Sequence, residues 1–243
     1  MKYASKSIVG LREENEDNLY APSSESGMQF VAVSDGMGGH AAGDVASNLV
    51  ITGVVDELSG IYRTDTIARL TRAVQNVNLD VYRTAASSVS MRGMGATLVC
   101  ALLESDSYIA ANVGDSRLYQ LDPSGLSRIT TDHSYVQMLV DAGSITPEEA
   151  YYHPQRNLIT RAIGIGIAVD IDIFECEWRE GDLLLLCSDG LCGVLKDDDI
   201  KEILLSAGTL EEKCESLVSA ALACGSSDNI TVVLAQNAGG EAV

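Results

Sequence analysis

The chain has few basic residues. Lys and Arg number 16 against 35 Asp and Glu, which gives a formal net charge of −19 over 243 residues. A protein that binds duplex nucleic acid non-specifically needs a cationic face, and so does a protein that docks on anionic lipid. The charge balance therefore argues against both partners. An acidic protein can still bind phosphate where bound metal ions reverse the local charge.

Long apolar runs and paired cysteines are also missing. No stretch approaches the roughly 20 apolar residues that span a bilayer, and residues 1–10 contain no apolar signal segment. The six cysteines form no Cys-x-x-Cys pair, and several lie within apolar runs. We interpret them as buried thiols in a reducing compartment. We therefore expect a cytoplasmic protein without a membrane partner.

The content of hydrophobic residues, 46%, is enough for a folded core, and the length suits one large domain or at most two small ones. Apolar spacing predicts helices at 41–58, 64–83, 135–142, 147–151, 197–206 and 210–224. β-rich runs predict strands at 30–34, 97–103, 108–113, 117–121, 170–177, 182–187 and 230–235. We expect the three strands between residues 97 and 121 to form antiparallel hairpins. Strict strand–helix alternation is absent, which favours an α+β fold of two packed antiparallel sheets covered by helices.

Four aspartates share one context beside predicted core strands. Asp35, Asp115 and Asp189 follow apolar runs, and Asp228 precedes one. Any one of them taken alone is more often a turn residue. Rigid strands that meet at one edge can place several carboxylates together, where they repel one another and resist ionisation. Mg²⁺ and Mn²⁺ remove that conflict because they prefer oxygen ligands, so the four together predict a metal site.

Two further motifs suit phosphate binding. Residues 35–40 read Asp-Gly-Met-Gly-Gly-His, and such glycines let a backbone approach a ligand closely before a helix whose first amides favour anions. The Gly-Lys-Ser/Thr of a nucleotide-binding P-loop is absent. Arg12 begins an acidic stretch, and an arginine can hold phosphate through two parallel hydrogen bonds. Each feature is weak alone: His40 is more often a surface or cap residue, and the stretch after Arg12 is more often a solvated charge run.

Six motifs occur in order along the chain. They are Arg12-x-x-Asn15-Glu16-Asp17, residues 35–40, Gly95-x-Thr97, Gly114-Asp115-Ser116-Arg117, Ser188-Asp189-Gly190 and Asp228-Asn229. In this order, and over about residues 3–235, the sequence resembles the metal-dependent protein phosphatases of type 2C in their compact bacterial form. The resemblance implies a central β-sandwich of two antiparallel sheets flanked by helix pairs. It also implies a single phosphatase domain over residues 1–243, with a mobile flap at about 136–156.

The resemblance further implies which residues bind metal. Asp35 would bridge two ions, Mn²⁺ or Mg²⁺. Asp189 and Asp228 would bind the first ion, and the backbone carbonyl of Gly36 would bind the second. Asp115 would bind a third, weaker ion together with Asp189. Two departures from the usual pattern, at Ala96 and at residues 192–193, remove none of these ligands.

An acid of the motif at residues 15–17 would complete the second metal site. Glu16 and Asp17 are both candidates for that ligand, directly or through water. Arg12 matches the phosphate-binding arginine of the family, and His40 matches the histidine proposed as general acid. The implied reaction is hydrolysis of phosphoserine and phosphothreonine in proteins by direct attack of a metal-bridging water.

The implied partners are phosphorylated proteins, and we expect a monomer that counteracts a Ser/Thr protein kinase. The substrates are either such a kinase and its targets or a phosphorylated regulatory protein. A pseudophosphatase that uses the fold only for binding would have lost ligand acids, and none is lost. A metal-dependent phosphodiesterase or nuclease would need a basic or aromatic track, which this acidic sequence lacks.

Overall fold

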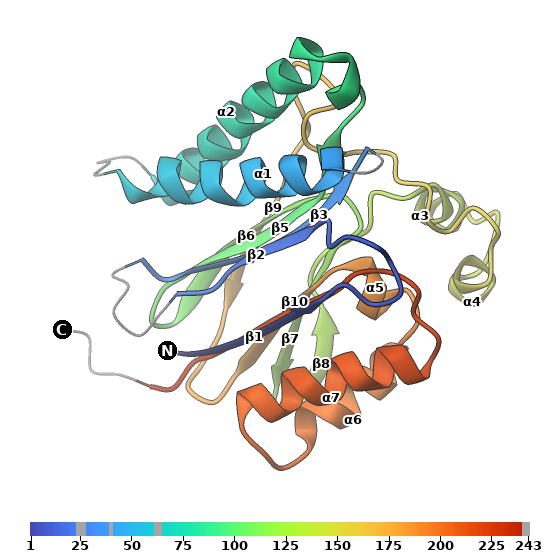
Figure 1. Ribbon diagram of the computed structural model, residues 1–243. Helices are drawn as coiled ribbons and strands as arrows, with labels where there is room; N and C mark the ends of the chain where they lie inside the picture. Colours follow the sequence, from blue (N-terminus) through green and yellow to red (C-terminus); the bar gives the residue numbers. More distant parts are fainter. Residues whose placement is uncertain (23–27, 39–40, 61–64, 240–243) are drawn as a thin grey trace.

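Two antiparallel sheets pack face to face between two pairs of helices (Figure 1). The computed structural model describes residues 1–22, 28–38, 41–60 and 65–239. One sheet contains β1 (Lys2–Ile8), β11 (Ile230–Gln236), β10 (Leu183–Cys187), β7 (Arg117–Asp122) and β8 (Gly125–Arg128), in that order. The other contains β2 (Asp17–Tyr20), β3 (Phe30–Met37), β5 (Leu98–Leu103), β6 (Ser107–Val113) and β9 (Asp172–Glu177), with β4 (Gly95–Ala96) paired to β3. The α+β sandwich expected from the sequence is confirmed.

Each sheet has its own pair of covering helices. Helices α1 (Ala41–Ser59) and α2 (Thr66–Ser87) pack on the sheet that contains β3, and α6 (Asp197–Leu205) and α7 (Leu210–Ala223) pack on the sheet that contains β10. A third apolar cluster fills the space between the sheets. All six residues of β5 are buried, because this strand is covered by helices on one face and by the second sheet on the other.

Local sequence accounts for the helices. The buried residues of α2 repeat at helical spacing and include Leu70, Val74, Val77 and Val81. The Asp65 carboxylate accepts a hydrogen bond from the third residue of the helix and caps its start. Helix α7 begins with a capping box. None of the helices in the described part of the chain is long and apolar enough to cross a membrane.

The chain crosses between the sheets after β6. Strands β5 and β6 form the expected antiparallel hairpin, but the second expected hairpin, between β6 and β7, is wrong. Strand β7 pairs with β10 and β8 instead. The crossing segment is Gly114-Asp115-Ser116, so the chain passes from one sheet to the other at one of the sites predicted to bind metal.

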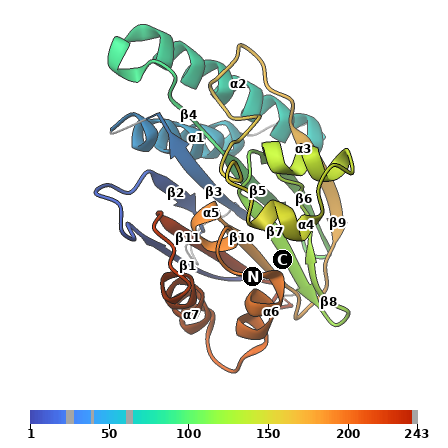
Figure 2. The same cartoon turned by 90° about the vertical axis from the view of Figure 1, so that its right-hand side faces the viewer.

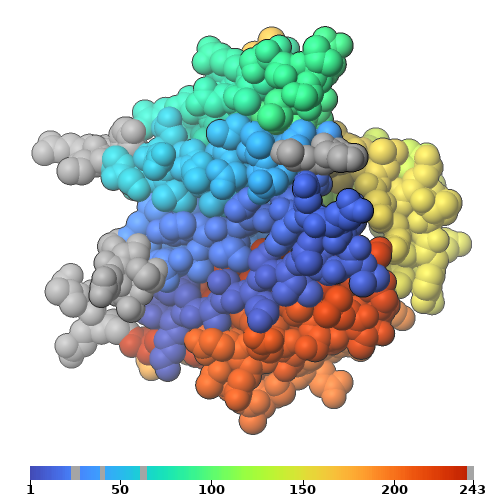
Figure 3. Space-filling view, viewed as in Figure 1, coloured from blue at the N-terminus to red at the C-terminus, as the bar shows by residue number. Residues whose placement is uncertain are grey.

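Short elements complete the structure. Helices α3 (Tyr135–Asp141) and α4 (Pro147–Tyr151) project from one end of the sandwich, at the right of Figures 1 and 3. Helix α5 (Asp189–Cys192) lies at the same end of the sandwich, as Figure 2 shows from that side. A single 3-10 turn, Val89–Met91, follows α2.

All six cysteines are free thiols. Four of them are buried, as the sequence predicted, while Cys176 is partly buried and Cys224 is exposed.

Candidate active site

Strands β2 and β3 bring two aspartates face to face. Asp17 begins β2 and is the Cα partner of Asp35 on the antiparallel strand β3. Residues directly opposite in an antiparallel pair project from the same face of a sheet, with Cβ atoms about 4.5–5.5 Å apart. Asp17 is only 6% exposed. Two carboxylates so placed repel each other unless a proton or a cation lies between them.

The second sheet contributes Asp189. Strand β10 ends at Cys187, and Ser188 immediately precedes α5, whose first residue is Asp189. The Ser188 hydroxyl donates to Asp17 Oδ2 at 2.7 Å and accepts from the backbone N–H of Thr231 at 3.0 Å. These two bonds fix the start of α5 against β2 and β11. The bond to Asp17 connects the two sheets beside the carboxylates.

Asp115 lies where the chain crosses between the sheets, and Asp228 lies just before β11. Asp115 is 8% exposed. Gly114 has a φ of 115°, and a Cβ there would collide with the Thr97 side chain, so the turn requires glycine. The Thr97 hydroxyl also accepts a hydrogen bond from the Asp35 backbone N–H at 2.9 Å. Thr97 therefore links the turn that carries Asp115 to the end of β3.

Burial and mutual repulsion raise the pKa values of these carboxyls. Burial raises the pKa of Asp35 well above its usual range. The neighbouring carboxylates that raise it further are those of Asp17, Asp189, Asp115 and Asp228. The same two causes raise the pKa of Asp17 to about 7 and that of Asp189 to about 6. The pKa of Asp115 is also raised, by burial and by Asp189. The acids predicted from separate parts of the sequence therefore face one another.

Arg12 and Glu16 lie at the edge of this group. Arg12 Nη2 is 2.8 Å from Asp228 Oδ2, and the Arg12 side chain is 55% exposed. The carboxylate of Glu16 lies close to Gly43 in the first turn of α1. Burial raises the pKa of Glu16, and the nearby Arg12 guanidinium opposes that rise. Arg12 is thus oriented by one carboxylate while most of its side chain remains open to solvent.

Gly36 packs tightly between the site and α1. Its backbone N–H donates to the carbonyl of Glu16 at 3.1 Å. A Cβ on Gly36 would collide with the carbonyl oxygen of Gly43, so only glycine lets α1 pack this close to β3. The Asp-Gly sequence after the apolar run therefore has a packing reason as well as the metal-binding role expected from the resemblance.

The structure describes eight of the nine residues that the sequence predicted for the site, and seven of them lie around the eighth, Asp35. They are Arg12, Glu16, Asp17, Asp35, Gly36, Asp115, Asp189 and Asp228. His40, which was expected to be the general acid, lies outside the described residues.

The donor set suits a hard divalent cation. One oxygen each of Asp17 and Asp189, in both cases Oδ1, is buried without a hydrogen-bond partner. Carboxylate oxygens are the ligands that Mg²⁺ and Mn²⁺ prefer, and a cation would offset the repulsion that raises the pKa values. No three His, Cys, Asp or Glu side chains of the described residues form a ready-made metal cluster. Bare carboxylates oppose closer approach, so we expect the group to tighten only around a cation.

Sequence reasoning missed the residues that support the acids. Ser188 was noted only as part of a motif, yet it joins Asp17 to β11. Asn229 also has a positioning role: its Oδ1 accepts from the Glu16 backbone N–H at 2.8 Å, and its Nδ2 donates to the carbonyls of Val9 and Glu14, both at 2.9 Å. The only available signal was that each directly adjoins a predicted ligand.

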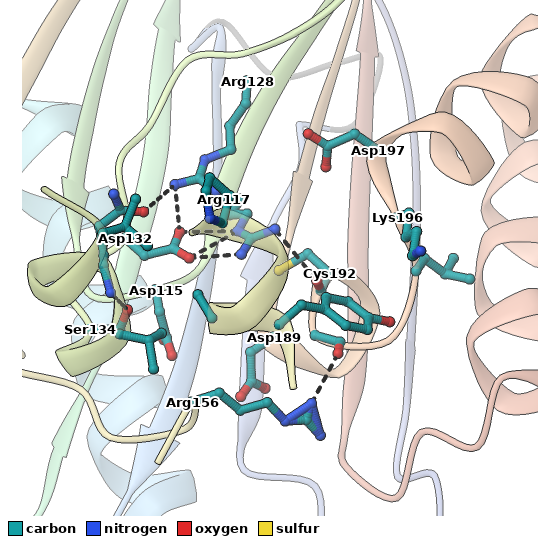
Figure 4. A pocket seen from close by; sticks show the side chains of 18 of the residues that line it. Asp115, Arg117, Arg128, Asp132, Ser134, Arg156, Asp189, Cys192, Lys196 and Asp197 are labelled. Carbon is teal, nitrogen blue, oxygen red and sulfur yellow. Dashed lines mark hydrogen bonds and ion pairs between the residues drawn. The ribbon is translucent and has the colours of Figure 1, made fainter. Parts of the chain in front are cut away.

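A cavity of about 710 Å³ opens beside the carboxylates. Figure 4 shows Asp115 and Asp189 among the side chains that line it, together with Arg117, Asp132 and Arg156. Part of its wall comes from α3, α4 and the chain that follows them to Asn157, which together form the projecting segment (residues 135–157). This segment therefore lies beside the carboxylate group. The cavity is large enough to receive part of a peptide next to the acids.

A family model described as protein phosphatase 2C matches residues 10–230. The chain belongs to this family.

Known relatives agree on the activity. The chain is 39% identical over 230 residues to the serine/threonine phosphatase stp of Listeria monocytogenes, covering 93% of this chain and 91% of the relative. The crystal structure of serine/threonine phosphatase Stp1 from Staphylococcus aureus matches with a TM-score of 0.91 and 37% identity, over 97% of this chain and 94% of that one. The catalytic domain of serine/threonine protein phosphatase PstP, solved in complex with 2 manganese ions, matches with a TM-score of 0.86 and 39% identity, over 97% of both chains. The chain is a protein serine/threonine phosphatase.

Proposed function

We propose that the chain hydrolyses phosphoserine and phosphothreonine in proteins with two divalent cations, Mn²⁺ or Mg²⁺, held around Asp35. One observation carries the proposal: Asp17 and Asp35 oppose each other across β2 and β3 while Asp189 meets them from the other sheet. That arrangement is unfavourable without cations, and two oxygens in it have no other partner. The manganese ions of the related PstP catalytic domain support the same assignment.

The proposed ligands form separate groups for the two cations, and Asp35 would belong to both groups. Asp189 and Asp228 hold the first cation, and the Gly36 carbonyl holds the second with help from the acids at residues 16–17. Asp115 and Asp189 together form a third, weaker site. Bound cations of this kind supply Lewis acidity and lower the pKa of water, which provides a nucleophile at neutral pH.

Arg12 is the proposed phosphate-binding residue. Its ion pair with Asp228 uses one of its nitrogens, Nη2, and the guanidinium has other N–H groups for the oxygens of a phosphate. A fixed guanidinium stabilises the charge that spreads over those oxygens in the transition state. We assign the donation of a proton to the leaving serine or threonine oxygen to His40.

The segment at 136–156 is the proposed flap of a single phosphatase domain. It bears part of the cavity wall beside Asp115, which supports a role in contacting the polypeptide that carries the phosphate. We propose that the protein acts as a cytoplasmic monomer that reverses the action of a Ser/Thr protein kinase.

Hydrolysis of a phosphothreonine peptide tests this function. We expect the purified protein to release phosphate with Mn²⁺ and to lose that activity in a chelator, because the carboxylates alone supply no nucleophile. Returning Mn²⁺ in excess should restore the rate. Equal rates with and without the chelator, in protein shown to be metal-free, would contradict the proposal.

Replacement of Arg12 tests the phosphate site. We expect Arg12→Ala to lower kcat/KM for the peptide about 100-fold, in line with the loss of one preorganised donor to a transition-state oxyanion. Arg12→Lys should recover part of that loss, because it keeps the charge without the two parallel donors. Arg83→Ala, which removes an exposed arginine of α2, is the matched control and should leave kcat/KM unchanged. A loss in the control equal to that of Arg12→Ala would show that net charge is responsible.

A further inference from the structure

The residues that lead into the projecting segment also grip the turn that carries Asp115. Asp132 and His133 come just before Ser134, the residue that caps α3. Arg117, two residues after Asp115, donates from Nε to Asp132 Oδ1 at 3.0 Å and from Nη2 to Oδ2 at 2.7 Å (Figure 4). Such a two-point pair is directional as well as strong. It fixes the turn on the side that follows Asp115.

His133 holds the same turn, on the side that precedes Asp115, with two hydrogen bonds. The backbone N–H of Gly114 donates to His133 Nδ1 at 3.0 Å, and the carbonyl of Gly114 accepts from the backbone N–H of His133 at 2.9 Å. Because Gly114 directly precedes Asp115, these bonds set the direction in which the Asp115 side chain leaves the backbone. The side chain of His133 is 7% exposed, so water does not compete strongly for its nitrogens.

The second ring nitrogen of His133, Nε2, also has partners. Since Nδ1 accepts a hydrogen bond, the proton of the neutral ring is on Nε2. Nε2 lies 3.1 Å from Asp172 Oδ2 and 2.8 Å from Arg161 Nη1, and this same Arg161 nitrogen pairs with Asp172 Oδ1 at 2.7 Å. This is the arrangement of a supporting residue whose two nitrogens have separate partners, one toward the site and one away from it.

Backbone hydrogen bonds join the two ends of the projecting segment to each other and fix the position of His133. The backbone N–H of Thr160 donates to the carbonyl of His133 at 2.8 Å. The backbone N–H of Tyr135 donates to the carbonyl of Leu158 at 2.8 Å. The chain entering the segment is therefore joined to the chain leaving it, directly beside the turn at Asp115.

We propose that His133 is a positioning residue for Asp115: through Gly114 it fixes the carboxylate at the weaker third metal site. The proposal rests on the function proposed above and adds a residue that does not touch metal or phosphate. The side chain acts through one hydrogen bond, from the Gly114 N–H to Nδ1. A substitution that keeps an acceptor at that point should preserve the site.

Two amide substitutions separate this role from simple packing. Asparagine places its side-chain oxygen near the position of Nδ1, whereas glutamine reaches toward the position of Nε2. His133→Asn therefore keeps the acceptor for Gly114 and loses the contact with Asp172, and His133→Gln does the reverse. Asp172→Asn is the control, because it weakens the outer contact and leaves the Gly114 bond in place.

The first readout is the Mn²⁺ dependence of peptide hydrolysis. For His133→Gln we expect kcat to fall about tenfold and the Mn²⁺ concentration for half-maximal rate to rise about tenfold, as is usual when a supporting partner of a metal ligand is lost. KM for the peptide should stay within about twofold of wild type, since phosphate binding is untouched. His133→Asn and Asp172→Asn should both behave nearly like wild type. Equal losses in the asparagine and glutamine variants, or wild-type metal dependence in His133→Gln, would overturn the proposal.

The second readout needs no metal or activity. Amide hydrogen exchange of Gly114 in the metal-free proteins reports directly on the bond to Nδ1. We expect slow exchange in wild type and His133→Asn and faster exchange in His133→Gln. Protection of Gly114 in His133→Gln equal to that in wild type would contradict the proposal. If instead wild-type hydrolysis proved independent of Mn²⁺, the proposed function would fail while this exchange experiment would still test the hydrogen bond.

Discussion

Replacement of Asp35 by asparagine should remove nearly all phosphatase activity. Asp35 lies at the centre of the carboxylate group, and the other four aspartates all raise its pKa. Loss of the ligand shared by both proposed cations removes several kcal/mol of charge stabilisation, so we expect kcat to fall by about 10³-fold or more. The measurement is phosphate release from a phosphothreonine peptide at saturating Mn²⁺, together with Mn²⁺ binding by calorimetry.

Stability distinguishes loss of the site from misfolding. Because Asp35→Asn removes one of several mutually repelling carboxylates, the metal-free variant should unfold at the same temperature as metal-free wild type or higher. Asp56→Asn, at an exposed acid of α1, is the control and should retain full activity. Full, metal-stimulated activity in Asp35→Asn would contradict the assignment of the site.

Removal of metal should make the stability of the protein fall as pH rises. The pKa of Asp17 is raised from 3.8 to about 7 and that of Asp189 from 3.8 to about 6. Between these limits the folded state binds more protons than the unfolded state, so the free energy of unfolding decreases with increasing pH. The contribution is complete below about pH 4, the usual value for an aspartate, and is lost as pH rises to about 7. Thermal unfolding in chelator at several pH values measures this slope.

Mn²⁺ should reverse that loss of stability near neutral pH. A ligand at about 100 times its Kd stabilises the folded state by about 2.7 kcal/mol. For a chain of this size, that corresponds to a rise in Tm of about 5–10 °C. Asp17→Asn should reduce the pH dependence of the metal-free protein, because one of the carboxyls with a raised pKa is gone. An unchanged slope in Asp17→Asn would contradict the raised pKa of Asp17, and the same Tm with and without Mn²⁺ would show that the carboxylates do not share a cation.

Much of the fold is readable from the sequence because its strands and helices carry strong local signals. The run Leu183–Cys187 is apolar at every position and forms the buried strand β10. The elements that were missed have weak signals. Strand β1 alternates irregularly and is mostly half-exposed, and β2 is only four residues long. Both obtain their order from pairing with distant strands, β11 and β3.

The crossing at residues 114–116 shows a second limit of sequence reasoning. Three apolar runs separated by turns favour successive hairpins, and nothing local indicates that the chain changes sheet after β6. The pairing of β7 with β10 involves residues more than 60 positions apart. For the same reason, the resemblance could identify Asp115 as a candidate ligand, but the contacts of Gly114 with His133 and of Arg117 with Asp132 emerge only from the folded chain.

The acids themselves were predictable because each adjoins a core strand. Their supporting residues were not, since Ser188 and Asp17 are separated by 171 positions and meet only when the two sheets pack together. The choice between Glu16 and Asp17 is sharpened by register: Asp17 faces Asp35 across the strands, while Glu16 lies beside Gly43 at the start of α1. Both are still candidate ligands of the second proposed cation.

The most direct test of the central claim is the crystal structure of the protein grown with Mn²⁺, with the metal located by its anomalous scattering. The account predicts two strong peaks within ligand distance of Asp35. One of them should also contact Asp189 and Asp228, and the other should contact the Gly36 carbonyl. Peaks confined to other surfaces, in crystals of protein that hydrolyses phosphothreonine only with Mn²⁺, would contradict the claim that these carboxylates form the catalytic centre.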